Sequence, residues 1–363
     1  SGGNNNGGDG GDGADRNQTG EAGSSYGGGG GGASDRNGAG GAGANGFVTI
    51  TYTVATAGPF IWYSYQSGDW GDAVNWTLDG GITPLYDNPS GYTPSTSPTS
   101  SSDKVVIQKG KTIIVQSGNN NKTNLELEVL GTIDMTTTTG HTFTTISGGG
   151  RIELSANNFP SGDATLFGGA NGDMGTVVYE GTGYTLSTAQ EFYNVEINQT
   201  NSSDVVVLTA DYIINGDLTI TNGELQINDN SSTIILNLTV GNNVSVEANG
   251  EISVGSGNTI GANNIGASEA GSTLPSTGNY HSIYHQFTIG GNFSNLGTVR
   301  FTNQTNPDYD DFTATGAVNI FFTGSANNTV QLDGQTDFYN LVVNKGSDQT
   351  YILEINSSST SNF

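Results

Sequence analysis

The sequence predicts an all-β protein whose main part is a right-handed parallel β-helix, a solenoid in which each short strand stacks on the strand one coil earlier. First, strands of β-branched and aliphatic residues recur from residue 103 onward, as in Val205-Val-Val-Leu208. Second, Gly, Asn and Asp separate them, and no window shows helical periodicity. Strands this short fit the coils of a solenoid, and asparagines at repeated corners can form a hydrogen-bonded ladder. Tandem β-sandwiches are the alternative.

Residues 1–46 form a glycine-rich segment without Val, Ile, Leu, Met, Phe or Trp. Because such a segment cannot bury apolar surface, a disordered linker is one interpretation. The other is polyglycine II, in which extended three-fold helices with bare backbones hydrogen-bond to one another. We expect part of residues 20–46 to lie in extended runs against its own chain or a neighbour.

Residues 47–102 are predicted to form a cap with a strand, two tryptophans and a loop. Phe47-Val-Thr-Ile-Thr-Tyr-Thr-Val54 alternates apolar and Thr residues, which is typical of a strand, and residues 82–102 are rich in Pro, Ser and Thr. Trp70 and Trp76 have two interpretations. They cap the open end of the solenoid core, or they form a stacking platform for a sugar.

Residues 103–363 are predicted to be the β-solenoid, with a repeat of about 146 residues. Two segments are near-copies: Glu191-Phe-Tyr-Asn-Val-Glu-Ile-Asn198 and Asp337-Phe-Tyr-Asn-Leu-Val-Val-Asn344. We expect Phe192 and Phe338 to be buried at matching places on successive units. The chain then stops within the second unit, so we interpret it as a fragment of a longer polypeptide.

Composition limits the function. The chain has 9 Lys+Arg against 34 Asp+Glu, a formal charge of −25, which disfavours binding to nucleic acid or to an anionic membrane face. It has no cysteine, which excludes disulfides, thiolate metal sites and cysteine nucleophiles. Only 12% of residues are charged, a profile typical of an extracellular protein, and no apolar run is long enough for direct membrane insertion.

A calcium site is the one cofactor that the sequence suggests. Asp308, Asp310 and Asp311 are bunched on a predicted turn, and their carboxylate oxygens are ligands that calcium accepts. A solvated acidic loop is the other interpretation of the same residues. We expect no other cofactor.

Catalysis is not expected. Polysaccharide-degrading β-helices need acidic side chains, with or without Arg or Lys, gathered on one exposed sheet face. Arg151 and Arg300 follow related turns and Glu153 accompanies the first, but no acidic side chains converge from several coils in the sequence pattern. Acidic side chains from three adjacent coils that meet in one groove would favour a carbohydrate-active domain instead.

A resemblance adds to this interpretation. Gly68-Asp-Trp-Gly-Asp-Ala-Val-Asn-Trp76, the segment from Asp103 to Val115 and the phrase from Phe287 to Thr298 resemble β-helical domains of very large surface proteins of the Bacteroidota phylum. The resemblance spans about 300 residues. The glycine-rich leader resembles modules of bacterial surface proteins and phage tail-fibre tips.

The resemblance implies export by the type IX system and a role as an adhesin or gliding-associated filament. We therefore expect a structural segment of an extracellular, cell-surface filament or adhesin, whose partners are other surface proteins, copies of itself or surface glycans. The alternative is a carbohydrate-binding or polysaccharide-degrading β-helix domain.

Overall fold

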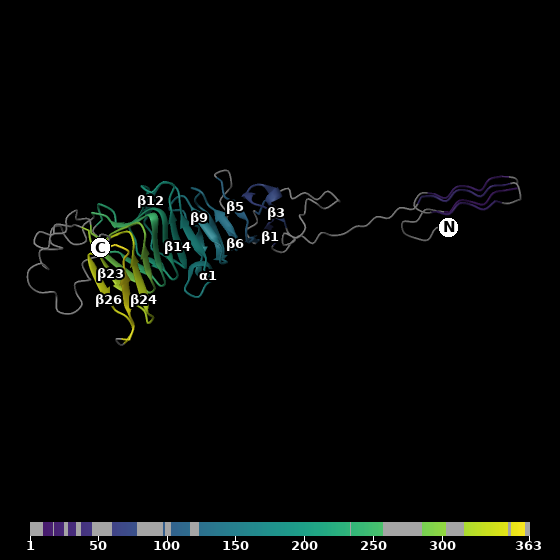
Figure 1. The fold of residues 1–363 in the computed structure, drawn as a ribbon. Coiled ribbons are helices and arrows are strands. Elements are labelled where there is room, and N and C mark those ends of the chain that lie inside the picture. Colours follow the sequence, from purple (N-terminus) through teal and green to yellow (C-terminus); the bar gives the residue numbers. More distant parts are fainter. Residues whose placement is uncertain are drawn as a thin grey trace, which may run out of the picture. The chain divides into compact units, whose positions relative to one another are not determined.

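The computed structural model describes residues 10–16, 18–24, 28–33, 38–45, 60–77, 97–98, 103–116, 123–232, 234–256, 285–302, 316–347 and 350–359 (Figure 1). It is 46% strand and 3% helical, so the all-β prediction is confirmed. Within the described residues, no helix has the length and apolarity that a membrane crossing requires. The chain divides into two compact units, Ser1–Gly58 and Pro59–Phe363.

The described residues of the first unit form extended glycine-rich runs that lie side by side (Figure 1). Backbone hydrogen bonds of 2.7–3.1 Å join the runs, and they recur at every third residue. In each pair the amide of the first residue donates to the carbonyl of the second. Donors three residues apart form three sets: Gly11–Gly29 with Ala14–Gly32, Gly20–Ala39 with Gly23–Ala42, and Gly41–Gly31 with Ala44–Gly28. Part of residues 20–46 therefore forms extended runs against its own chain, as predicted.

The described residues of the second unit form three sheets. The first has the order β10(Ser161–Asp163), β8(Thr142–Ser147), β6(Thr123–Val129), β4(Lys104–Ile107), β1(Ile61–Ser64), β3(Trp76–Thr77). The third has the order β13(Gln190–Phe192), β16(Tyr212–Ile214), β18(Asn237–Val240), β20(His285–Ile289), β23(Val318–Phe322), β26(Asn340–Val343). Two short helices, η1(Ala73–Asn75) and α1(Thr165–Gly168), interrupt the strands.

The second sheet has 15 strands. Its main path is β2(Gly68–Asp69), β5(Thr112–Ile114), β7(Thr132–Asp134), β9(Arg151–Leu154), β11(Thr176–Tyr179), β14(Asn194–Asn198), β17(Leu218–Ile227), β19(Val244–Val254), β21(Phe293–Asn295), β24(Asn328–Leu332), β27(Leu353–Asn356). Off this path lie β12(Tyr184–Leu186), β15(Val205–Leu208), β22(Thr298–Arg300) and β25(Gln335–Asp337).

The long strands β17 and β19 each contribute to two rows of this sheet. The first halves of β17 and β19 pair with each other and with β14 and β21. They belong to the main path from β2 to β27, which we call row 1. The second halves of these two strands pair with β15 and β22, and we call that path row 2. From β11 to β27 the chain repeatedly visits row 1, row 2 and the third sheet in that order before it returns to row 1. Among the described strands only β1 and β3 pair in antiparallel fashion, so the alternative of tandem β-sandwiches is wrong.

One apolar cluster fills the interior of the second unit from Trp62 to Leu332. Strand alternation places every second side chain in it, as the burial pattern of β17 shows. Because the strands pair in register, inward residues stack: Leu218 lies beside Val244, Val244 beside Phe293, and Phe293 beside Val330. Each fully buried side chain of this kind contributes roughly 1.5–3 kcal/mol.

A ladder of polar side chains follows the corner where the chain enters row 1. Asn194 Oδ1 accepts the backbone amide of Asp217 at 2.9 Å, and Asp217 Oδ1 accepts that of Asn243 at 3.0 Å. Asn243 Oδ1 then accepts the amide of Asn292 at 3.0 Å, and Asn292 Oδ1 that of Thr329 at 2.9 Å. The predicted ladder is therefore present, and it satisfies one backbone donor at each step from β17 to β24.

The two near-copies do not occupy matching places, so that prediction is wrong. Phe192 ends β13 in the third sheet, is 1% exposed, and precedes β14 in row 1. Phe338 is partly buried between β25 in row 2 and β26 in the third sheet. The shared sequence encodes two short strands that flank a corner, with the Phe side chain facing inward. This local geometry fits more than one corner of the second unit.

The predicted boundary after residue 102 does not separate two units. β1 pairs in parallel with β4, and β2 pairs with β5, so the tryptophan-containing residues 60–77 continue the same sheets. The strand predicted at residues 47–54 and most of the loop at 82–102 lie outside the described residues.

Candidate functional site

The structure places both tryptophans of the predicted sugar platform in the core. Trp70 and Trp76 are each 0% exposed, and their rings meet edge to face with centroids 4.9 Å apart. The indole of Trp76 donates to the carbonyl of Trp70 at 2.9 Å, and that of Trp70 donates to the carbonyl of Pro98 at 3.2 Å. Neither ring offers a face to a sugar, because both side chains are fully buried. This corrects the platform interpretation and agrees with the capping one.

The residues of the predicted calcium turn, Asp308, Asp310 and Asp311, lie outside the described residues. Calcium binding there stays a prediction.

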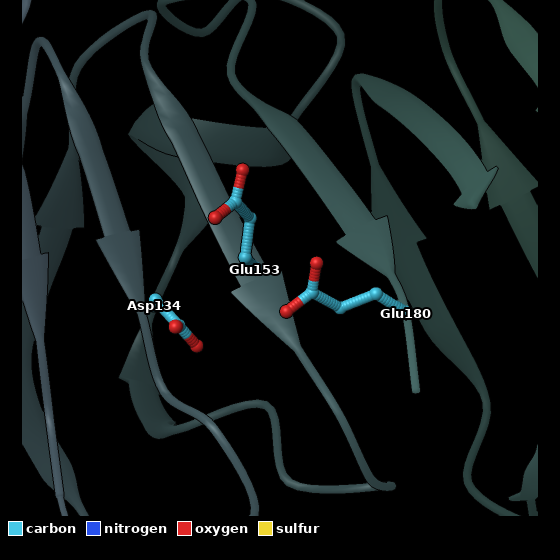
Figure 2. A group of neighbouring side chains, drawn as sticks. All are labelled: Asp134, Glu153 and Glu180. Atoms are coloured by element: carbon cyan, nitrogen blue, oxygen red, sulfur yellow. The ribbon is translucent and has the colours of Figure 1, made fainter. Parts of the chain in front are cut away.

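Three carboxylates that the sequence pattern did not bring together meet on row 1 (Figure 2). Asp134 ends β7, Glu153 lies in β9, and Glu180 directly follows β11. In-register pairing places Asp134 beside Glu153, and the Glu180 amide donates to the carbonyl of Leu154 at 2.8 Å. Each of the three residues offers a carboxylate oxygen, and these oxygens lie within 4.8 Å of one another. The prediction that no acidic side chains converge from several coils is therefore wrong.

Alternation along the strands explains why these side chains share one face. Ile133, Ile152 and Tyr179 point into the core, so the residue after each points outward. A motif search in the sequence misses the cluster because the loops between the strands differ in length, and α1 lies in one of them. The sequence signal that could have found the cluster is an acidic residue directly after an inward-facing residue, repeated in successive strands.

Neighbouring groups orient the cluster. Asp134 Oδ1 accepts the backbone amide of Thr136 at 2.7 Å, and Ser155 Oγ donates to Glu180 at 3.4 Å. Arg151 lies between two carboxylates: its Nε is 3.7 Å from Glu153, and a terminal guanidinium nitrogen is 2.9 Å from Glu196. Arg151 therefore pairs with Glu153 and Glu196, and Asp134 and Glu180 have no ion pair within the described residues.

Burial and repulsion favour protonation of two of these groups. Burial raises the pKa of Glu153; the charges of Asp134 and Glu196 add to this, and Arg151 opposes it. Burial also raises the pKa of Glu180, and the charges of Glu153 and Asp134 raise it further. A proton or a bound cation would relieve this repulsion.

The cluster suits two kinds of chemistry. The three carboxylates offer oxygen ligands at a separation that fits a divalent cation such as calcium. Further oxygen ligands would complete the coordination of the cation. Two close carboxyl groups, one of them with a raised pKa, also fit the acid and base roles of glycoside cleavage. Arg151 lies in row 1 and Arg300 in row 2, so the two arginines with related sequence contexts belong to different rows.

No protein family, curated protein or solved structure matches this chain.

Proposed function

We propose that this chain is a structural segment of a large extracellular surface filament or adhesin, built on a right-handed parallel β-helix. The observation that carries the proposal is the continuous parallel pairing along row 1 from β2 to β27, around one apolar cluster. At about 4.8 Å per strand, this path spans roughly 50 Å. A stack of this kind suits spacing and presentation, because each coil is bonded to the next along its whole length.

The glycine-rich unit supports a surface role in a different way. We propose that its runs are polyglycine II helices, because their hydrogen bonds recur at every third residue and polyproline-type helices have three residues per turn. Such a bundle packs without large side chains. It provides a compact module where residues 1–46 have no Val, Ile, Leu, Met, Phe or Trp with which to build a core.

Composition supports the extracellular, cell-surface location. The charge of −25, the low share of charged residues and the absence of cysteine fit a secreted polypeptide that relies on β-ladders rather than disulfides. The partners we propose are other surface proteins, copies of the chain and surface glycans. Export by the type IX system and a role in gliding motility rest on the sequence resemblance alone.

A second function is favoured by one observation. The carboxylates of Asp134, Glu153 and Glu180 come together from three adjacent strands, and glycoside cleavage uses a pair of neighbouring carboxyl groups. Arg151 beside them adds the basic group that such sites use. The alternative is therefore a polysaccharide-degrading β-helix whose acid and base are among these residues.

One experiment separates the two functions. Cells that make the parent protein without residues 103–359 are compared with cells that carry Asp134→Asn, Glu153→Gln and Glu180→Gln together. We expect the deletion to impair surface attachment or movement and the triple variant to retain both. We also expect the purified chain to show no turnover on a polysaccharide panel. A growth defect on one polysaccharide that the triple variant reproduces would overturn the structural function in favour of the enzymatic one.

A further inference from the structure

A polar groove lies on row 2, away from the carboxylates of row 1. Its cavity has a volume of about 230 Å³ and is lined by side chains from three successive strands. The lining residues are Glu224 and Gln226 of β17, Glu251, Ser253 and Val254 of β19, Arg300 of β22, and Thr302. A water molecule occupies about 30 Å³ in the liquid, so the groove has room for a ligand of several heavy atoms.

One wall of the groove is already ordered. Glu224 and Glu251 are paired directly across β17 and β19, as are Gln226 and Ser253. The carboxylate of Glu224 accepts hydrogen bonds from the amide of Gln226 at 3.2 Å and from the hydroxyl of Ser253. This carboxylate is therefore positioned before any ligand arrives, which lowers the ordering cost of binding.

The other two charged groups are close but do not pair. Burial raises the pKa of Glu251 and the charge of Glu224 adds to this, while the positive charge of Arg300 opposes it. Yet within the described part of the chain, no ion pair includes Arg300. Its Nε is buried without a hydrogen-bond partner there. A donor left unsatisfied in this way costs about 1–3 kcal/mol, and a ligand oxygen would satisfy it.

The charges restrict the chemistry of the ligand. Two carboxylates oppose an anion, and the guanidinium opposes a metal cation. A hydroxyl group both donates and accepts, so neighbouring hydroxyls can bond a carboxylate and the guanidinium together. We propose that this groove binds a neutral saccharide unit, with Glu251 accepting and Arg300 donating across the gap between them. The inference rests on the proposed adhesin function and names its glycan contact.

The test is calorimetric titration of the full chain with neutral oligosaccharides of glucose, galactose, mannose and N-acetylglucosamine. We expect at least one of them to bind. Arg300→Gln and Glu251→Gln should each weaken binding about tenfold, the loss expected when one hydrogen bond to a charged group is removed. The control is Lys104→Gln, which removes a basic residue of β4 in the first sheet and should leave the affinity unchanged. Circular dichroism and thermal midpoints of each variant show whether it is folded.

Three results would overturn the inference: no neutral oligosaccharide binds, binding is insensitive to both groove variants in folded protein, or an oligouronate or calcium binds there instead. The proposed adhesin function is tested separately by the deletion of residues 103–359. If that deletion abolishes attachment while no oligosaccharide binds, the adhesin function stands and the glycan site does not.

Discussion

The two compact units hold their backbones together by opposite means. In the glycine-rich unit the runs approach so closely that a Cβ at Gly30 would overlap the carbonyl oxygen of Gly41, and one at Gly41 would overlap that of Glu21. The hydrogen bonds between runs depend on the absence of side chains. In the second unit, stacked side chains such as Val244 and Phe293 fill the interior, and the ladders enclose them.

The difference shows which substitutions each unit tolerates. An added methyl group damages the first unit where backbones touch, and a removed side chain damages the second where residues stack. The three tryptophans, Trp62, Trp70 and Trp76, all belong to the second unit, so their fluorescence reports its unfolding alone. The two units can therefore be followed separately in one chain.

The largest effect is expected from a cavity in the stacked core. Phe293 is 1% exposed and its ring lies 5.9 Å from that of Phe338 and 6.4 Å from that of Phe322. We expect Phe293→Ala to lower the free energy of unfolding of the second unit by about 3–5 kcal/mol, measured by urea denaturation with tryptophan fluorescence. Leu296→Ala is the matched control: this side chain is 48% exposed and its loss should cost under about 0.5 kcal/mol. Equal effects would contradict the stacked core.

The next effect distinguishes the glycine-rich unit. Gly30→Ala places a methyl group against the backbone of a neighbouring run, and we expect it to destabilise the bundle by about 1–3 kcal/mol. Hydrogen exchange should show faster amide exchange at Gly31 and Gly41, with tryptophan-monitored unfolding unchanged. At Gly32 an added Cβ meets nothing within 4 Å, so Gly32→Ala should leave exchange as it was. If both substitutions act alike, close backbone packing does not hold the runs.

Much of the fold is predictable from local patterns, because each strand carries its own signal. Val205–Leu208 is a run of β-branched and aliphatic residues, Leu218–Ile220 alternates apolar residues with Thr, and Asn194, Asn243 and Asn292 precede inward-facing residues at one corner. These features depend on neighbours within a few residues. They can therefore be recognised without knowing which coil lies next to which.

The site is less predictable, because it depends on register between strands. Asp134 and Glu180 become neighbours of Glu153 only once the lengths of the intervening loops, including α1, bring β7, β9 and β11 side by side. The same dependence explains why Phe192 and Phe338 turn different corners in spite of similar sequences. The burial of Trp70 follows from its pairing with β5, which the sequence does not show.

A smaller effect is expected from the corner ladder, which adds side-chain hydrogen bonds to the stacked unit. Asn243→Ala removes the acceptor of the Asn292 amide and a donor to Asp217. We expect a loss of about 1 kcal/mol in the free energy of unfolding by urea. Asn249→Ala, in the same strand β19, is the control, because its exposed side chain makes no hydrogen bond within the described residues. A control that costs as much as Asn243→Ala would show that the ladder contributes nothing.

The smallest effect is a pH dependence confined to the second unit. Because the pKa values of Glu153 and Glu180 are raised in the folded chain, the folded state binds more protons than the unfolded state between the unfolded and folded values. Their contribution to stability is fully present below the ordinary value of 4.5 and is lost as the pH rises through the raised values. Another carboxylate acts in the opposite direction: the backbone amides of Ser231 and Ser232 donate hydrogen bonds to Asp229 and lower its pKa. The pH dependence of stability must therefore be compared between variants, because the stability curve of a single protein combines opposing contributions.

Glu153→Gln with Glu180→Gln removes both titrating groups of the cluster. We expect this double variant to gain stability relative to the unmodified chain as the pH rises from about 4 to about 7, measured from urea midpoints by tryptophan fluorescence. The exposed Glu126→Gln changes the net charge without touching the cluster and serves as the control. Amide protection in the glycine-rich unit, compared at one pH, should be the same in all three proteins, because the cluster lies in the other unit. A double variant with the same pH slope as the unmodified chain would mean that burial and repulsion do not raise the pKa values of Glu153 and Glu180 in the folded protein.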